Sequence, residues 1–427
     1  MEPDIDAGKV RGFGETAKFP DVLRGRSVYL ETYGCRYNFG DTAKLVEILR
    51  QRGCTIASDP EEADAVIVNT CTVIGPTERR MLRRLAGFQD HELYVTGCMP
   101  KIQREAILAV CSPVFIDPET VHELYRSVGT VARSGVGIVQ VSQGCAGKCT
   151  YCITRFARGA LKSFPPDEIL GQVRAHVRAG AVEIQLTAQD MSAWGMDTGQ
   201  LLPELLMELD RIPGSHRIRV GMMNPATVKN QAKDIAEAFT GEHIFRFIHL
   251  PVQTGSDAVL GRMKRGYTVA EFEMIVGLFR NQVPGITVAT DMIVGFPGET
   301  ETDFAASLNL IMRVKPAKVN VTRYSSRPFT PVAREKDVPD ELKKDRSRAM
   351  NSVSEEVYTL LNAPQIGTTV PFLVTEVLRK GSVMARSPHY TGVVIPEDLP
   401  VGSTGTALLV KDRKYFFIGK CMEWSSP

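Results

Sequence analysis

Three of the nine cysteines are grouped within eight residues, and their spacing is typical of a metal cluster. Cys145, Cys149 and Cys152 form a C-x3-C-x2-C pattern. Three thiolates at this spacing can each bind one iron of a [4Fe–4S] cluster, which leaves the fourth iron open. Structural zinc is the alternative, but zinc prefers four ligands and no fourth ligand is adjacent. The pattern predicts a cluster whose open iron can bind a small chelating molecule.

A second trio of cysteines is spread over the first hundred residues. Cys35, Cys71 and Cys98 each follow a short apolar segment that predicts a strand. The carboxyl ends of successive parallel strands meet at one edge of a doubly wound sheet, so these thiols should converge. The alternative is three buried small hydrophobic residues, a common role of free cysteine. That alternative suits the cysteines without this placement, which are Cys54, Cys111 and Cys421.

The elements that must position these cysteines fall into an α/β order. Strands expected at 27–31, 65–69, 92–96 and 113–116 alternate with helices at 39–52, 76–88, 100–110 and 119–129. This alternation predicts a parallel sheet with helices on both faces. Six further strands follow, at 138–142, 182–187, 217–222, 244–249, 286–293 and 318–324. Each is followed by a helical pattern, which predicts three-quarters of a (β/α)₈ barrel.

The last part of the chain has a different residue pattern. Short strands expected at 369–377, 382–386, 391–395, 405–410 and 415–421 are separated by glycines. This spacing predicts a small antiparallel barrel of about five strands. The predicted division is a loose arm at 1–26, a sheet domain at 27–132, a partial barrel at 133–362 and a small barrel at 363–427.

The central cysteines, with Tyr151 directly before the third, resemble the signature of the radical SAM superfamily. The resemblance implies that S-adenosylmethionine (SAM) chelates the open iron, and that one electron then produces a 5′-deoxyadenosyl radical. It also implies a contact between Tyr151 and the adenine. Two glycine-containing strand ends, 250–256 and 291–299, resemble SAM-binding elements, although each is also a plausible ordinary turn. The candidate SAM contacts are Tyr151, Arg158, Gln189, Gln253, Ile293, Gly295 and Pro297.

The N-terminal trio resembles the methylthiotransferases, a radical SAM subfamily. The segments 34–38, 69–73 and 97–98 read Gly-Cys-x-x-Asn, Asn-Thr-Cys-x-Val and Gly-Cys, and the C-terminal strands resemble a TRAM domain. Residues 31–35 and 69–79 most resemble the archaeal and eukaryotic enzymes for N6-threonylcarbamoyladenosine in tRNA. The resemblance implies two [4Fe–4S] clusters and transfer of a methylthio group to C2 of that adenosine, at position 37 beside the anticodon. SAM would supply both the methyl group and the radical.

Other functions remain open at this stage. The target could instead be isopentenyladenosine in tRNA or an aspartate of a ribosomal protein. The second cluster could serve only as an electron relay, or the chain could be an RNA-binding module with structural metal sites. Each methylthiotransferase alternative also needs an electron donor and a sulfide source as partners, which the sequence does not identify.

The formal net charge of +2 is too small to imply a partner. Support for RNA binding therefore comes from local clusters of charge. Arginines cluster at 79–84, and basic residues at 323–348 include Arg327, Lys343 and Arg346. Basic residues at 379–415 are interspersed with aromatic residues such as Tyr390. Phosphate contacts and stacking on unpaired bases are expected there. The alternative is a solvated face with acidic neighbours.

A cytoplasmic protein is expected, with no membrane partner. The chain opens on an acidic segment without the apolar core of a signal peptide, and no apolar run approaches the roughly 20 residues that span a bilayer. A reducing compartment disfavours disulfides, which agrees with grouped cysteines that bind metal.

Overall fold

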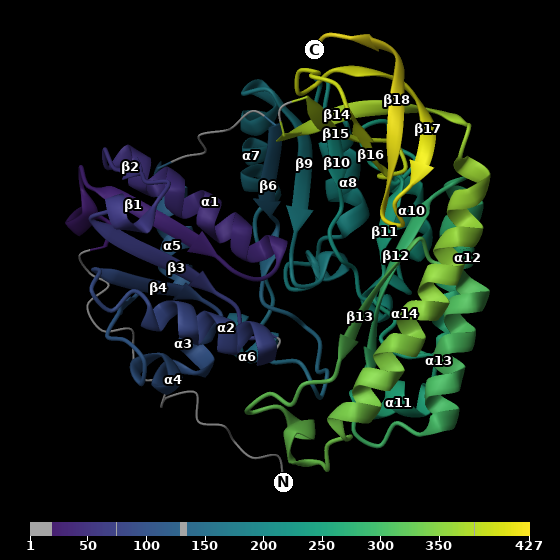
Figure 1. Cartoon of the computed structure of the whole chain (residues 1–427), viewed down its shortest axis with the longest axis horizontal. Coiled ribbons are helices and arrows are strands. Elements are labelled where there is room, and N and C mark those ends of the chain that lie inside the picture. Colours follow the sequence, from purple (N-terminus) through teal and green to yellow (C-terminus); the bar gives the residue numbers. More distant parts are fainter. Residues whose placement is uncertain (1–18, 74, 129–134, 380) are drawn as a thin grey trace. The chain divides into compact units, whose positions relative to one another are not determined.

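The computed structural model describes residues 19–73, 75–128, 135–379 and 381–427, which form two compact units (Figure 1). The first unit consists of Met1–Val131, Cys152–Gly159 and Arg327–Phe329. The second unit consists of Ala132–Tyr151, Ala160–Ser326 and Thr330–Pro427. The small C-terminal barrel is therefore grouped with the central barrel, and the predicted division at 362/363 stays a prediction.

The first unit is built on a parallel sheet of order β2-β1-β3-β4-β5, as the sequence predicts. The strands are β1 (Ser27–Thr32), β2 (Thr55–Ile56), β3 (Ala65–Thr70), β4 (Leu93–Gly97) and β5 (Val114–Phe115). The two-residue strand β2 is too short to give a sequence pattern and was not expected. All six residues of β3 are buried, because both faces of the sheet are covered by helices.

Helices cover this sheet on both faces. They are α1 (Arg36–Gln51), α2 (Gly75–Ala86), α3 (Met99–Ile102), α4 (Arg104–Leu108) and α5 (Pro118–Val128). Leu45 of α1 and Val121 of α5 pack with Ile67 in one core, whereas Met81 of α2 and Ile107 of α4 pack in another. Where one helix was expected over 100–110, the chain forms α3 and α4, because the backbone leaves the helical conformation at Gln103.

The predicted N-terminal arm is partly integrated into the first unit. Residues 1–18 of that arm lie outside the described residues. Phe19 and Leu23 are buried in the same core as α1 and α5, around a short 3-10 helix at Asp21–Leu23. Residues 19–26 are therefore anchored by these two buried apolar side chains, which differs from the predicted loose arm.

The second unit contains six parallel strands in sequential order, which confirms the partial (β/α)₆ barrel. They are β6 (Gly135–Gln140), β9 (Ala181–Thr187), β10 (Arg217–Arg219), β11 (Phe247–His249), β12 (Thr287–Val294) and β13 (Lys318–Arg323). A parallel bridge between Ile218 and Ile244 joins the two halves. A short antiparallel pair, β7 (Ser142–Gln143) and β8 (Lys162–Ser163), lies outside the barrel strands.

The barrel helices are α7 (Pro166–Arg178), α8 (Leu202–Asp210), α9 (Pro225–Val228), α10 (Ala232–Ala238), α11 (Asp257–Met263), α12 (Val269–Gln282) and α13 (Glu301–Val314). Two of them begin with capping boxes, in which Thr268 or Thr300 exchanges hydrogen bonds with an acidic residue three positions later. These caps fix where α12 and α13 begin.

A long helix, α14 (Asp340–Asn362), leads to the closed C-terminal barrel, drawn in yellow-green to yellow in Figure 1. Its strands are β14 (Thr369–Arg379), β15 (Ser382–Arg386), β16 (Gly392–Ile395), β17 (Thr404–Asp412) and β18 (Phe416–Ser425). The predicted small barrel of five strands is confirmed, and its strand pairs are antiparallel except for β16 and β18, which pair in parallel. A closed ring of an odd number of strands cannot alternate direction throughout.

Tyr390 joins the two barrels within the second unit. Its ring lies 4.9 Å from the ring of Phe245 and 5.0 Å from that of Phe247, and its hydroxyl donates to Glu183 at 2.7 Å. The expectation that Tyr390 stacks on an RNA base is therefore wrong, because protein rings already occupy its faces. Lys380, another member of the same basic stretch, lies outside the described residues.

His216 gives the second unit a testable dependence on pH. This residue is 3% exposed and its ring stacks on His243 at 4.5 Å. Burial, followed by the nearby His243, lowers the pKa of His216 to about 4. Since an unfolded histidine titrates near 6.5, only the unfolded chain gains this proton as the pH falls from about 6.5 to 4, and stability declines over that range.

We expect His216→Phe to reduce the stability that is lost between pH 7 and pH 5 by roughly 2 kcal/mol. Urea unfolding of both proteins at the two pH values measures this difference. An equal loss in the variant and the unchanged protein would show that His216 does not titrate as described.

Candidate functional site

The N-terminal cysteines follow three neighbouring strands of the first unit, as predicted. The register pairs Thr32 of β1 with Asn69 of β3, and Thr70 of β3 with Gly97 of β4, so the three strand ends lie side by side. Cys35, Cys71 and Cys98 are the next or nearly next residues after these ends. Convergence is close: a Cβ atom on Gly34 would lie 2.7 Å from Cβ of Cys71.

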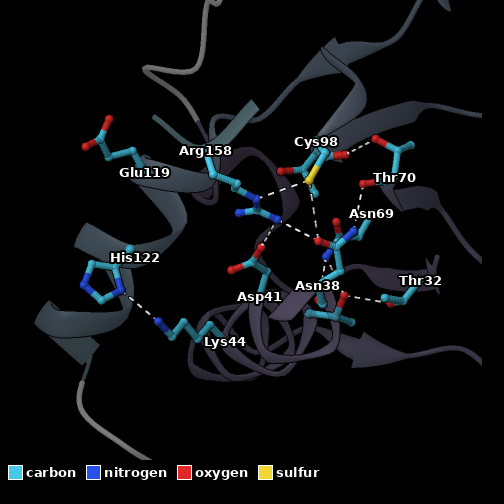
Figure 2. Close-up of polar contacts among 12 residues, drawn as sticks. Thr32, Asn38, Asp41, Lys44, Asn69, Thr70, Cys98, Glu119, His122 and Arg158 are labelled. Atoms are coloured by element: carbon cyan, nitrogen blue, oxygen red, sulfur yellow. Dashed lines mark hydrogen bonds and ion pairs between the residues drawn. The ribbon is translucent and has the colours of Figure 1, made fainter. Parts of the chain in front are cut away.

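Asn38, the asparagine of the Gly-Cys-x-x-Asn segment, braces the loops that carry these cysteines (Figure 2). Its Nδ2 donates to the carbonyl oxygens of Tyr33 and Thr70, both at 2.8 Å. Its Oδ1 accepts a hydrogen bond from Arg158 at 2.7 Å and lies 3.8 Å from Sγ of Cys98. One buried amide thus ties the ends of β1 and β3 to the Cys98 loop.

The Asn-Thr pair before Cys71 has a similar role. Asn69 Nδ2 donates to the carbonyl oxygen of Asn38 at 2.7 Å, and Thr70 Oγ1 donates to that of Thr96 at 2.6 Å. The Cys98 amide donates to the carbonyl oxygen of Thr70 at 2.9 Å. Because buried backbone groups need partners, these side chains fix the cysteine loops without taking part in metal binding.

Arg158 lies among these residues of the first unit, on the short helix α6 (Thr154–Arg158). Its Nη2 donates to Oδ2 of Asp41 at 2.7 Å and its Nε donates to Sγ of Cys98 at 3.3 Å (Figure 2). The guanidinium also lies 4.9 Å from the ring centre of Tyr37. Arg158 is 3% exposed, and its Nη1 has no hydrogen-bond partner among the described residues. Its predicted contact with SAM stays untested.

The chemistry of this pocket fits an iron–sulfur cluster. Burial raises the pKa of the Cys71 thiol to about 12, and burial likewise raises the pKa of Cys98. Such thiols become ligands only when a nearby positive charge, such as iron, replaces the proton. A Cβ atom on Gly97 would collide with Thr70 and Asn69, so this loop needs glycine. Nη1 of Arg158, which has no hydrogen-bond partner among the described residues, could donate a hydrogen bond to a cluster sulfur.

Single-ion binding is not favoured by the arrangement. Within the described ranges, no three His, Cys, Asp or Glu side chains are close enough to hold one metal ion. A [4Fe–4S] cluster spaces its thiolate ligands more widely than one ion does.

In the second unit, Cys145 and Cys149 lie on either side of a glycine. The Gly147 amide donates to Sγ of Cys145 at 3.2 Å. A Cβ atom on Gly147 would lie 3.2 Å from Sγ of Cys145 and 3.9 Å from Sγ of Cys149. Cys152 belongs to the first unit, so convergence of all three central cysteines stays a prediction.

Arg265 is a buried cation beside Cys149 that the sequence analysis missed. Its Nη1 donates to Sγ of Cys149 at 3.4 Å, its Nε to the Tyr267 hydroxyl at 3.0 Å and its Nη2 to the Pro251 carbonyl oxygen at 3.0 Å. Arg265 is 8% exposed. The sequence Lys264-Arg265-Gly266 reads as surface charge, and only the strand end at Pro251 brings it to the cysteine loop.

Several predicted SAM contacts lie together at the carboxyl ends of the barrel strands. The rings of Tyr151 and Phe296 are arranged edge to face with their centroids 6.2 Å apart, and Tyr151 and Ile293 pack against the same buried cluster. The backbone of Gln253 is paired with β12, because the Ile293 amide donates to its carbonyl oxygen at 2.8 Å. Gln189 follows β9, and its buried Oε1 has no hydrogen-bond partner among the described residues. This grouping is where barrel enzymes bind their ligands.

Residues of α14 pack against the turn that follows β12. Gly295 has a φ of +71°, and a Cβ atom there would collide with Lys343. The Gly295 amide donates to Glu299 at 2.7 Å, and Glu299 in turn accepts from Arg346 at 2.7 Å. Close packing against Lys343 is thus one reason why this position needs glycine. Contacts of Gly295 and Pro297 with SAM stay untested.

The predicted basic stretch at 323–348 contains both buried and exposed residues. Lys343 and Arg346 are each 3% exposed and pair with Asp337 and Glu299, and Arg327 pairs with Glu78 in the first unit. The phosphate-binding prediction is wrong for these three residues. Other basic residues of this stretch are exposed, including Arg323, Arg334, Lys344 and Arg348, and so are Arg79, Arg80, Arg379 and Arg413 elsewhere.

Two regions of the chain match known protein families. Residues 139–311 match the family model described as the radical SAM superfamily, and residues 27–115 match the one described as uncharacterized protein family UPF0004. A radical SAM methyltransferase from Kitasatospora setae has a similar fold, with a TM-score of 0.51 at 15% identity over 72% of this chain and 75% of that one. Among the described helices, none is long and apolar enough to cross a membrane.

Full-length relatives share both regions. A protein of Pyrococcus abyssi named probable threonylcarbamoyladenosine tRNA methylthiotransferase is 38% identical over 86% of this chain and 93% of its own length. One of the same name from Methanothermobacter thermautotrophicus is 36% identical over 92% and 98%. The human threonylcarbamoyladenosine tRNA methylthiotransferase is 31% identical over 87% and 70%. The chain therefore belongs to this family of radical SAM tRNA methylthiotransferases.

Proposed function

We propose that this enzyme transfers a methylthio group to C2 of N6-threonylcarbamoyladenosine at position 37 of tRNA. The observation that carries the proposal is the set of three braced thiols, Cys35, Cys71 and Cys98, in a chain that also has a radical SAM domain. C2 of adenine carries an unactivated C–H bond, which acid–base chemistry does not open and a radical does. Relatives named for this substrate span most of the chain.

Two [4Fe–4S] clusters and SAM are the proposed cofactors. Cys145, Cys149 and Cys152 would hold one cluster, and the N-terminal trio would hold the other. When bound, these groups supply the electron that cleaves SAM and the sulfur that is transferred. The chain itself binds and orients them: Asn38 fixes the N-terminal cysteine loops, and Arg265 holds the Cys149 loop to the barrel.

Contact with the tRNA would come from exposed basic and aromatic residues of the C-terminal barrel. Arg379 and Arg413 are exposed, and Tyr415 is 61% exposed, so these side chains remain available to phosphates and unpaired bases. The target adenosine must leave its stack to react, and this costs least in a loop such as the anticodon loop. An electron donor and a sulfide source complete the reaction, and a cytoplasmic location is expected.

The test is nucleoside mass spectrometry of tRNA after anaerobic incubation with the reconstituted protein, SAM, dithionite and sulfide. One tRNA sample carries threonylcarbamoyladenosine and the other carries isopentenyladenosine. We expect a 2-methylthio product from the first sample alone. Product from the second alone would reassign the substrate, and 5′-deoxyadenosine without either product would favour a protein target.

Replacing one N-terminal cysteine should separate the two cluster functions. Cys71→Ala should still cleave SAM to 5′-deoxyadenosine, because the central cysteines are intact, but it should form no methylthio product. Both products are measured in one reaction by mass spectrometry, with Cys54→Ala as the matched control, since Cys54 is a buried cysteine outside both trios. A full yield of methylthio product from Cys71→Ala would rule out the proposed role of the N-terminal cluster.

A glycine substitution tests the N-terminal site without removing a thiol. Gly97→Ala should lower the iron content from about eight to about four atoms per chain, since its Cβ atom would collide with the backbone of Thr70. The matched control is Gly53→Ala, which also has a positive φ but would place its Cβ atom in open space. Iron and sulfide assays after anaerobic reconstitution measure the outcome. If both variants bind the full iron content, the Cys98 loop does not form the site.

A further inference from the structure

Each proposed cluster site has one buried arginine that donates a hydrogen bond to a ligand sulfur. Arg158 Nε donates to Cys98 at 3.3 Å in the first unit, and Arg265 Nη1 donates to Cys149 at 3.4 Å in the second. The two arginines are 3% and 8% exposed. Because the two sites lie in different folds and their arginines come from different elements, this likeness is not a by-product of one structural motif.

The two arginines differ in their counter-charge. Arg158 is paired with the carboxylate of Asp41 at 2.7 Å, and that side chain is itself only 8% exposed. The hydrogen-bond partners of Arg265 are a sulfur, a hydroxyl and a backbone carbonyl, which carry no formal negative charge apart from the thiolate itself. Asp190 and Asp291 act on Arg265 only at longer range, since neither forms an ion pair with it among the described residues. The local charge is therefore close to zero at Cys98 and positive at Cys149.

This difference bears on how readily each cluster accepts an electron. Reduction takes a [4Fe–4S] cluster from the 2+ to the 1+ state and adds one negative charge. A buried cation stabilises that charge more strongly than a solvated one, because the local dielectric constant is low. Hydrogen bonds to the cluster sulfurs act in the same direction and raise the reduction potential. A carboxylate beside the cation offsets the effect.

We propose that Arg265 and Arg158 each raise the reduction potential of the neighbouring cluster, and that Asp41 makes the effect at the N-terminal cluster the smaller of the two. The proposal rests on the two clusters of the proposed function. Its consequence is that an electron from the donor is favoured at Cys149, where SAM is cleaved, over the cluster that handles sulfur.

The test measures potentials instead of turnover, in full-length protein with one cluster at a time. Replacing Cys145, Cys149 and Cys152 by Ala leaves the N-terminal cluster, and replacing Cys35, Cys71 and Cys98 leaves the central one. Each protein is titrated with dithionite in the presence of mediator dyes and without SAM or tRNA, and the reduced cluster is followed by electron paramagnetic resonance. Substrate identity therefore does not affect the result.

For the central cluster, Arg265→Met should lower the equilibrium constant for reduction at least tenfold, which is about 59 mV for one electron. Arg265→Lys should recover most of this loss, because the charge is kept while the shape of the side chain changes. A merely structural arginine would not show rescue by lysine in the potential. An unchanged potential in Arg265→Met would overturn this half of the proposal.

For the N-terminal cluster, Asp41→Asn should raise the potential, because it removes the counter-charge and keeps a hydrogen-bond acceptor for Arg158. The double variant Asp41→Asn/Arg158→Met should then have a lower reduction potential than Asp41→Asn alone. The double variant is used because Arg158→Met by itself would leave the buried carboxylate of Asp41 unpaired. Arg155→Met is the matched control: it removes an exposed arginine from the same helix and should change nothing.

A potential that is unchanged or lower in Asp41→Asn would overturn the role assigned to Asp41. A protein that binds no cluster at the N-terminal cysteines would overturn it as well, together with the proposed second cluster. If the potentials shift as expected but no methylthio product forms on tRNA, the electrostatic proposal holds and the proposed substrate fails.

Discussion

The buried ion pair between Arg158 and Asp41 is the interaction on which the arrangement of the N-terminal site depends. Breaking such a pair by removing one partner leaves a charge without compensation in a low-dielectric interior, which typically costs about 3–5 kcal/mol. Arg158 lies six residues after Cys152 and its helix belongs to the first unit. The pair therefore holds a segment that continues directly from the central cysteine pattern against the loops of Cys98 and Asn38.

Parallel strand topology explains why a cluster can be built at this place at all. Strands β1, β3 and β4 end together, and their loops leave backbone carbonyl groups that need donors. Asn38 and Thr70 provide such donors, so the small polar residues around each cysteine belong to the architecture of the sheet edge. Cysteines far apart in sequence converge because the fold brings the ends of their strands together, and the side chains between them stop the loops from separating.

Much of this could be predicted from local patterns. The alternation of apolar strands and helices gives the two parallel sheets, and cysteine spacing gives both candidate clusters. What could not be predicted depends on contacts between distant residues. Arg158 looked like a possible SAM contact, since nothing in the sequence links it to Asp41. Arg265 looked like surface charge, and the parallel pairing of β16 with β18 follows from closure of a five-stranded ring, which no single strand reveals.

The same reasoning changes where RNA should be expected to bind. Runs of basic residues in sequence do not distinguish solvated cations from internal ones. Burial decides between them, because the donors of a buried cation need partners within the protein. Lys343 and Arg346 support the turn at Gly295, whereas Lys344 and Arg348 of the same helix are exposed. With a net charge of only +2, attraction to a polyanion must come from exposed residues such as Arg379 and Arg413. Because such contacts are screened by salt, tRNA affinity that depends on them should weaken steeply with ionic strength, whereas the buried pairs should not respond.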